Sequence, residues 1–214
     1  MSGLRASMRL YGLVKNSGST DNPQRQPVDI LCLTNRTGGT AIRAFVSCLD
    51  AELMTRSAGL DDYRVIPLRT FDPTAFIDAH QGWLMLHICC GFVAPVGHSL
   101  LKDDAYVYSE IGQWTAGHHL DLGTQMADLL QSTYERNHLR NYNAWLNELD
   151  DATPAELAWH VDEAWRYLQT AATPDSREHC HALFDPVDNR WRFAATDIDI
   201  YQPHPESLKQ GALN

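Results

Sequence analysis

The stretch WLMLHICCGFVAPV, residues 83–96, decides the fold because it is the longest mainly apolar run in the chain. It is too short to cross a bilayer as a helix, which needs about 20 apolar residues. A short continuous apolar run indicates a strand that is buried on both faces of a sheet. We therefore expect Trp83–Phe92 to form the central strand of the fold.

Shorter segments on both sides of this run predict the rest of the sheet. The expected strands are Met8–Val14, Val28–Leu33, Tyr63–Leu68, Ala105–Ile111 and Trp191–Tyr201. Apolar residues at i, i+3, i+4 and i+7 spacing predict a helix that begins at Thr40 and ends near Gly59.

Helical spacing also dominates the second half of the chain. Two rotated stripes between Met126 and Leu149 predict a kink or two helices, and the capping-box pattern from Thr153 to Glu156 begins another helix. Strands dominate early and helices later, which favours an α+β fold. We expect a mixed or antiparallel sheet of about five to seven strands, a helix after the second strand and a helical C-terminal half.

Turn-forming residues divide the chain into three parts. Residues 16–27 read NSGSTDNPQRQP and predict a loop. We therefore expect an N-terminal strand and flexible loop over 1–27, a single α+β domain over 28–202 and a tail over 203–214.

The charge balance limits the class of partner. The 214 residues contain 17 Lys and Arg against 27 Asp and Glu, a formal charge of −10. This acidic balance argues against general nucleic-acid binding and favours a protein partner, in particular a basic one. No apolar segment predicts a contact with a membrane.

The cysteines indicate the redox compartment. There are five, an odd number, without a CxxC pair. This pattern predicts free thiols in a reducing environment, so we expect a cytoplasmic protein.

A thiol and an imidazole form the first candidate for chemistry. Cys48 would be the nucleophile, with Cys32 as its rival, and His98 would be the base. Glu110 or Gln113 would orient the imidazole. An imidazole lowers the pKa of a neighbouring thiol and later protonates the leaving group.

The expected arrangement resembles that of papain-like hydrolases, in which the catalytic histidine opens a strand beside the helix that bears the nucleophile. A hairpin of residues 98–101 with 105–111 would place His98 in this way. The predicted helix departs from the pattern, because it puts Cys48 well inside the helix, where a thiol gains little from the N-terminal dipole.

Two further patterns concern anions and metals. The segment Asn35–Thr40, NRTGGT, lies between an expected strand and an expected helix, so its backbone amides would cradle a small anion. The residues that would hold the anion are Arg36, Gly38, Gly39 and Thr40. Histidine clusters occur at 118–119 and 179–181, but no HExxH or paired Cys/His spacing is present. We expect no metal and no cofactor.

Trp159 marks a candidate partner surface. It lies opposite the apolar stripe of its predicted helix, and Arg166 follows on the same side. Two function classes stay open: an accessory, immunity-like or regulatory domain that binds a protein through an acidic, tryptophan-bearing surface, and a cysteine-dependent hydrolase or amide-transforming enzyme. Buried, inert cysteines with an exposed Trp159 would favour the first class.

Overall fold

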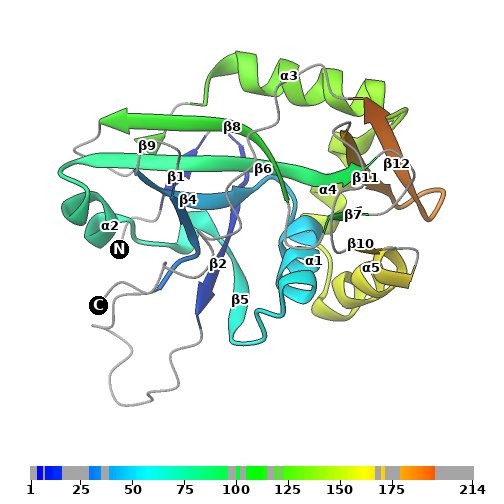
Figure 1. Cartoon of the computed structure of the whole chain (residues 1–214), viewed down its shortest axis with the longest axis horizontal. Coiled ribbons are helices and arrows are strands. Elements are labelled where there is room, and N and C mark those ends of the chain that lie inside the picture. The colour runs from blue at the N-terminus through cyan, green and yellow to red at the C-terminus, as the bar shows by residue number, and fades with distance from the viewer. Residues whose placement is uncertain are drawn as a thin grey trace.

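The structure is a computed structural model, and it describes residues 4–6, 8–15, 29–34, 39–95, 100–101, 105–114, 119–120, 122–166, 170–171 and 179–195. In these ranges an eight-stranded sheet carries helices on both faces. In Figure 1, α3 (Gly123–Arg136) lies above the long strands, whereas α1 (Cys48–Ala58) and α5 (Pro154–Arg166) lie below them.

The main sheet is mixed. Its strand order is β12 (Arg190–Ala195), β11 (His179–Asp185), β6 (Trp83–Pro95), β4 (Thr40–Phe45), β2 (Tyr11–Lys15) and β5 (Tyr63–Pro67), with β3 (Cys32–Thr34) beside β4 and β8 (Ala105–Trp114) beside β6. β4 and β6 run parallel, and the other pairs are antiparallel. The prediction of a mixed α+β fold is therefore confirmed.

Two small sheets complete the strand pairing of the described residues. β1 (Arg5–Ala6) pairs with β9 (His119–Leu120), and β7 (Leu100–Leu101) pairs with β10 (Thr170–Ala171). β8 pairs with β6. The structure thus pairs Leu100–Leu101 with β10 rather than in the expected hairpin with β8.

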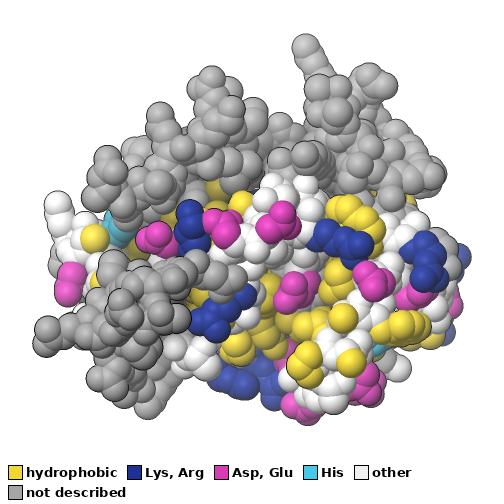
Figure 2. All heavy atoms as spheres, turned by 90° about the horizontal axis from the view of Figure 1, so that it is seen from below, with side chains coloured by type: hydrophobic (Ala, Val, Ile, Leu, Met, Phe, Trp, Pro, Cys, Tyr) yellow, Lys and Arg dark blue, Asp and Glu magenta, His cyan; other side chains and the backbone are white. Residues whose placement is uncertain are grey.

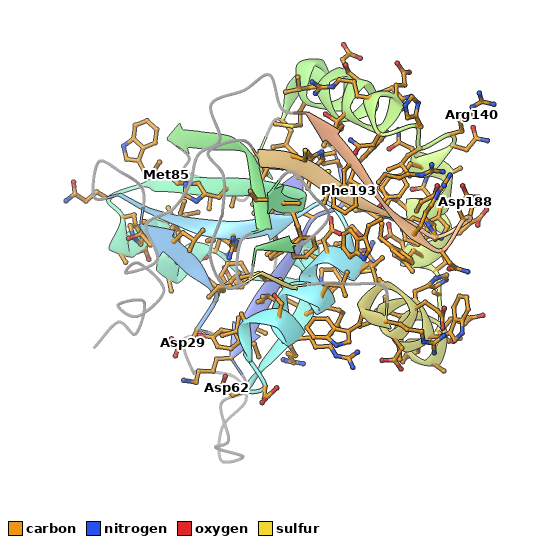
Figure 3. All side chains as sticks on the ribbon, turned by 45° about the vertical axis from the view of Figure 1, so that its right-hand side comes forward. Asp29, Asp62, Met85, Arg140, Asp188 and Phe193 are labelled. Carbon is orange, nitrogen blue, oxygen red and sulfur yellow. The ribbon has the colours of Figure 1, made fainter. Side chains whose placement is uncertain are left out.

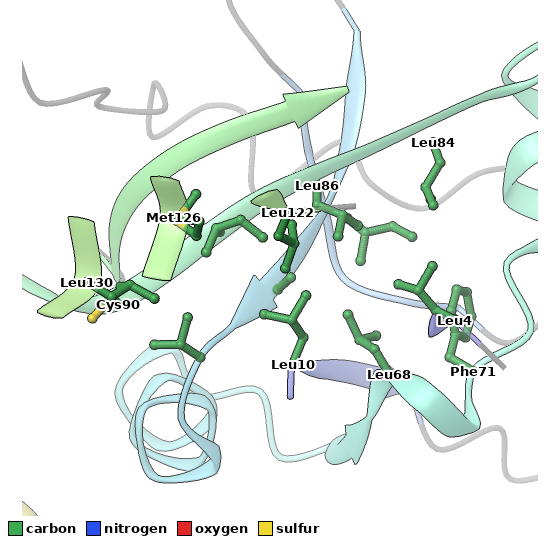
Figure 4. Close-up of a cluster of buried hydrophobic side chains, with 14 of the residues drawn as sticks. Leu4, Leu10, Leu68, Phe71, Leu84, Leu86, Cys90, Leu122, Met126 and Leu130 are labelled. Carbon is green, nitrogen blue, oxygen red and sulfur yellow. The ribbon is translucent and has the colours of Figure 1, made fainter. Parts of the chain in front are cut away.

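β6 separates two hydrophobic cores because alternate residues point to opposite faces. Leu84, Leu86 and Cys90 face the core that α2 (Thr74–Ala79) and α3 cover, as Figure 4 shows. Cys89 and Phe92 face the second core, which α1 and α5 cover. The prediction that this run forms the central strand is confirmed.

The alternation changes at Gly91, where the pairing of β6 with β8 is irregular. Gly91 has a φ of +67°, and a Cβ there would lie 2.4 Å from the Ala182 carbonyl oxygen of β11. The amide of Gly91 donates to Asp50 Oδ2 at 2.8 Å. The bulge thereby joins β6, β11 and α1.

The prediction that a helix begins at Thr40 is wrong. Thr40–Phe45 is strand β4, and α1 begins only at Cys48, where the Ser47 side chain accepts hydrogen bonds from the amides of Leu49 and Asp50. Both faces of β4 are buried, so its apolar residues do not alternate with polar ones as in a half-exposed strand. Thr40 is consequently a strand residue and not a helix cap.

The second half of the chain is helical only in part. α3 and α4 (Tyr142–Asp150) are separated at His138 and Asn141, both of which have positive φ. The capping box at Thr153 is present, since Glu156 Oε2 accepts from the Thr153 amide at 2.7 Å and the Thr153 hydroxyl accepts from the Glu156 amide at 3.3 Å. After α5 the chain returns to strands. None of the helices in the described ranges is long and apolar enough to cross a membrane.

The hairpin of β11 and β12 closes this end of the sheet. Asp185 Oδ1 accepts from the Val187 amide at 3.0 Å and from the Asp188 amide at 3.2 Å, which fixes the turn. Arg192 pairs with both Asp185 and Asp188 at 2.6 Å. Asp188 is labelled at this rim of the molecule in Figure 3.

We predict that Gly91→Ala lowers the free energy of unfolding by about 3 kcal/mol or more, because the new Cβ would meet backbone that cannot move away alone. The matched control is Gly59→Ala, where φ is +65° but no atom lies within 4 Å. The control should lose only the backbone term, about 1–2 kcal/mol. Urea denaturation monitored by circular dichroism measures both, and equal losses would contradict a special role for Gly91.

Candidate functional site

α4 and α5 form the surface that we call the α4–α5 face. It consists of exposed side chains on and between these helices, namely Glu148, Asp151, Glu156, Trp159, Asp162 and Arg166. The opposite side of α5 holds the helix in place. Leu157, Val161 and Trp165 pack on the second core, and Trp191 Nε1 donates to the Ala164 carbonyl at 3.1 Å.

Trp159 is 51% exposed, although it is among the largest apolar side chains in the chain. The centres of the Trp159 and His160 rings lie 4.8 Å apart in an edge-on arrangement. The centres of the His160 and Trp145 rings lie 5.7 Å apart in the same kind of arrangement. Trp145 in turn lies 5.2 Å from Tyr142, which is buried. One side of the indole is therefore fixed against an aromatic layer that reaches into the core, and the other side faces solvent.

The charge of this region is strongly acidic. Residues 142–166 contain six carboxylates and one basic side chain, Arg166, so their formal charge of −5 is half of the −10 of the chain. In the described ranges four of these carboxylates have ion-pair partners: Asp150 and Asp151 with Arg9 at 2.6 and 4.0 Å, Asp162 with Arg56 at 2.7 Å, and Glu163 with Arg166 at 2.6 Å. On the face seen in Figure 2, acidic, basic and apolar side chains are interspersed rather than separated by kind.

Cys48 is the first residue of α1 and not a mid-helix residue. A thiol at a helix N-terminus is favoured as a thiolate by the helix dipole. Here burial works against ionisation, and with the negative charges of Asp150 and Asp50 it raises the pKa of the Cys48 thiol to about 12. The thiol is therefore protonated at neutral pH.

Three more thiols, those of Cys32, Cys89 and Cys90, are protonated for the same reason. Burial, with a smaller effect of Asp29, raises the pKa of Cys32 to about 12, and the Cys32 thiol donates to the Ile30 carbonyl at 3.3 Å. Burial also raises the pKa of Cys89 and places that of Cys90 well above its ordinary value. All five cysteines are free, as predicted.

The structure does not describe the side chain of the proposed base, His98, or that of its orienting group, Glu110. His98 is outside the described residues. Glu110 is in β8, directly opposite His87 of β6, and His87 is directly opposite Arg43 of β4. The three residues therefore form one row across adjacent strands.

Sequence reasoning missed Arg43 and His87, which are both fully buried. An Arg43 nitrogen lies 3.8 Å from Met54 Sδ, and its guanidinium carbon lies 5.9 Å from the Phe45 ring centre. The only signal was the presence of ionisable residues inside apolar runs. Since Arg43 was assigned to a helix, this signal could not be interpreted.

The predicted anion loop is described only in part. Arg36 and Gly38 lie outside the described residues, and Gly39 leads directly into β4. Thr40 pairs with Thr34 of β3, so the segment leads into a strand and not into a helix N-terminus. A helix dipole therefore does not stabilise an anion at Thr40, contrary to the expectation from the sequence.

His181 of β11 serves the fold. His181 Nε2 donates to the Cys90 carbonyl at 2.6 Å, and its Nδ1 lies 3.4 Å from the Asn137 amide nitrogen. Burial lowers the pKa of His181 to about 4, so the ring is neutral at pH 7. Within the part of the chain that the structure describes, no three His, Cys, Asp or Glu side chains gather as a metal site would require.

We predict that Cys32, Cys48, Cys89 and Cys90 of the native protein react slowly with iodoacetamide at pH 7, because only the thiolate is nucleophilic and burial keeps it protonated. Short pulses between about pH 6 and 9, a range that includes the ordinary thiol pKa of about 8.5, followed by peptide mass spectrometry, give the rate at each site. Fast labelling of Cys48 at pH 6 that slows in His98→Ala would instead demonstrate a thiol–imidazole pair.

Asp50 and His181 have opposite effects on stability in acid. Burial raises the pKa of Asp50 from 3.8 to about 6, so its contribution to stability is present below pH 3.8 and is lost as the pH rises through 6. The pKa of His181 falls from 6.5 to about 4, so its contribution is present above pH 6.5 and is lost as the pH falls through 4.

We predict that Asp50→Asn, which keeps an acceptor for the Gly91 amide, removes the Asp50 effect alone. From pH 7 to 4 the wild type should gain about 2 kcal/mol relative to the variant, because the pKa of Asp50 rises from 3.8 to about 6 on folding. Denaturant unfolding at each pH measures this difference. A constant difference between the two proteins would show that Asp50 has the same pKa in both the folded and unfolded states.

Comparison with known proteins gives no relative for this chain. No family model, no curated protein and no solved structure matches it. The function is therefore inferred from the chain's own side chains.

Proposed function

We propose that the protein is an accessory or regulatory binding module, which holds a protein partner on its α4–α5 face. The observation that carries the proposal is the half-exposed indole of Trp159, fixed from behind by His160. Exposed tryptophan that is already held in one position adds contact area at little cost in conformational entropy.

The charge of the face supports a basic partner. The formal charge of −5 over residues 142–166, which the paired Arg9 and Arg56 reduce to −3, attracts basic segments and raises their rate of association. The remaining proposals are a cytoplasmic location, which the five free thiols support, and an absence of cofactors.

The alternative function, a cysteine-dependent hydrolase, has one observation in its favour, the position of Cys48 at the N-terminus of α1. Its buried thiol lies near Asp150 and Asp50, and negative charges oppose the thiolate that catalysis requires. Binding through Trp159 demands no such change of ionisation, so we place it first.

We predict that a photo-crosslinking residue at Ala155, exposed one turn before Trp159, captures a partner in the cell of origin. Trp159→Ala in the same protein should weaken the crosslink at least about fivefold, because a central interface tryptophan contributes more than about 1 kcal/mol. Mass spectrometry of the crosslinked product identifies the partner and the residues joined.

Two controls accompany this experiment. The same crosslinker at Asp78, an exposed residue of α2, should capture nothing, and Trp83→Ala, which removes a second exposed tryptophan, should leave the Ala155 crosslink unchanged. Equal capture from Ala155 and Asp78, or no effect of Trp159→Ala, would argue against this face as the binding surface.

A further inference from the structure

α5 contains a short internal repeat. The tetrapeptides Glu156-Leu-Ala-Trp159 and Asp162-Glu-Ala-Trp165 each place an acidic residue three positions before a tryptophan. Residues at i and i+3 of a helix are neighbours on its surface. Each copy thus presents a carboxylate beside an indole.

The second copy already holds an arginine. Arg56 of α1 donates to Asp162 Oδ1 at 2.7 Å, and its guanidinium carbon lies 4.7 Å from the centre of the Trp165 ring. The guanidinium is therefore bound by a carboxylate and by the face of an aromatic ring at once. Arg56 and Asp162 are 106 positions apart, so this contact joins α1 to α5.

The first copy faces elsewhere. The second copy begins six positions after the first, and at about 100° per residue the two copies point about 120° apart around the helix axis. Trp165 packs against the core beside α1, whereas both Glu156 and Trp159 are exposed.

Both members of the first copy are held in place. The capping box fixes Glu156, because its Oε2 accepts from the amide and the hydroxyl of Thr153 at 2.7 and 2.8 Å. These hydrogen bonds lower the pKa of Glu156, so the carboxylate is charged at neutral pH. His160 supports the indole of Trp159 at a ring distance of 4.8 Å.

We propose that Glu156 and Trp159 form an arginine-binding site for the partner protein, equivalent to the site in which Asp162 and Trp165 bind Arg56. The proposal rests on the proposed function and specifies the chemistry of its partner, a basic segment that presents a guanidinium. The guanidinium lies on the indole and pairs with the carboxylate, and no covalent step is involved.

The test uses N-acetylarginine amide as the probe and its citrulline analogue as the neutral control of the same shape. Titration of the ¹⁵N-labelled full-length protein, followed through the tryptophan indole signals, reports binding at each indole. We expect a saturable shift of the Trp159 signal with the arginine probe and none with citrulline. The arginine probe should bind more weakly at Trp83 than at Trp159. Trp83 is 43% exposed, but the residue three positions before it is His80 and not a carboxylate.

Two variants distinguish the effect of the Glu156 carboxylate from the effect of the net charge of the protein. Glu156→Gln keeps a capping side chain but removes the charge, and it should weaken arginine binding to Trp159 about two- to fivefold. Asp128→Asn on α3 changes the net charge equally and should have no effect. Trp159→Phe assigns the indole signal.

An equal response to citrulline, equal binding at Trp83, or unchanged binding in Glu156→Gln would overturn the arginine site. If the Ala155 crosslink still depends on Trp159 in that case, the α4–α5 face binds its partner by other chemistry and the proposed function stands. If arginine binds but no partner is captured, the site is present and the proposed function fails.

Discussion

Gly91 joins three parts of the molecule, and its contacts leave no room for any side chain. Its amide donates to Asp50 Oδ2 at 2.8 Å, which anchors the first turn of α1 to the middle of β6. The Ala182 carbonyl approaches to 2.4 Å of the place where a Cβ would stand, so β11 lies close against β6 only because residue 91 is glycine. The position of α1 and of the β11–β12 hairpin both depend on this residue.

The candidate surface depends on the same anchor through two further steps. α1 carries Arg56, which reaches Asp162 and Trp165 of α5, and β12 carries Trp191, which donates to the Ala164 carbonyl of α5. α5 is thus held by α1, which Gly91 contacts directly, and by β12, the hairpin partner of the β11 strand that packs on Gly91. Trp159 lies on the other side of that helix, so its orientation follows from contacts made in the core.

Much of the fold could be predicted because local patterns and tertiary contacts agree there. β6 is a continuous apolar run, and the capping box between Thr153 and Glu156 uses only neighbouring residues. β4 was assigned wrongly because a strand buried on both faces shows no alternation, and Ile42, Phe45 and Val46 also fit helical spacing. That one error moved the start of α1 by eight residues, from Thr40 to Cys48, and so misplaced Cys48 within its helix.

The candidate site also has one part that could be predicted from the sequence and one part that could not. The outward position of Trp159 follows from the stripe of its own helix and could be predicted. The role of its acidic neighbour could not, because it becomes visible only when Arg56 is seen between Asp162 and Trp165. That contact uses an acidic residue three positions before a tryptophan, and the same spacing occurs at Glu156 and Trp159 on the exposed side of α5. On our proposal, the recognition chemistry that binds Arg56 within the fold is offered to a second molecule about 1.7 turns earlier in α5.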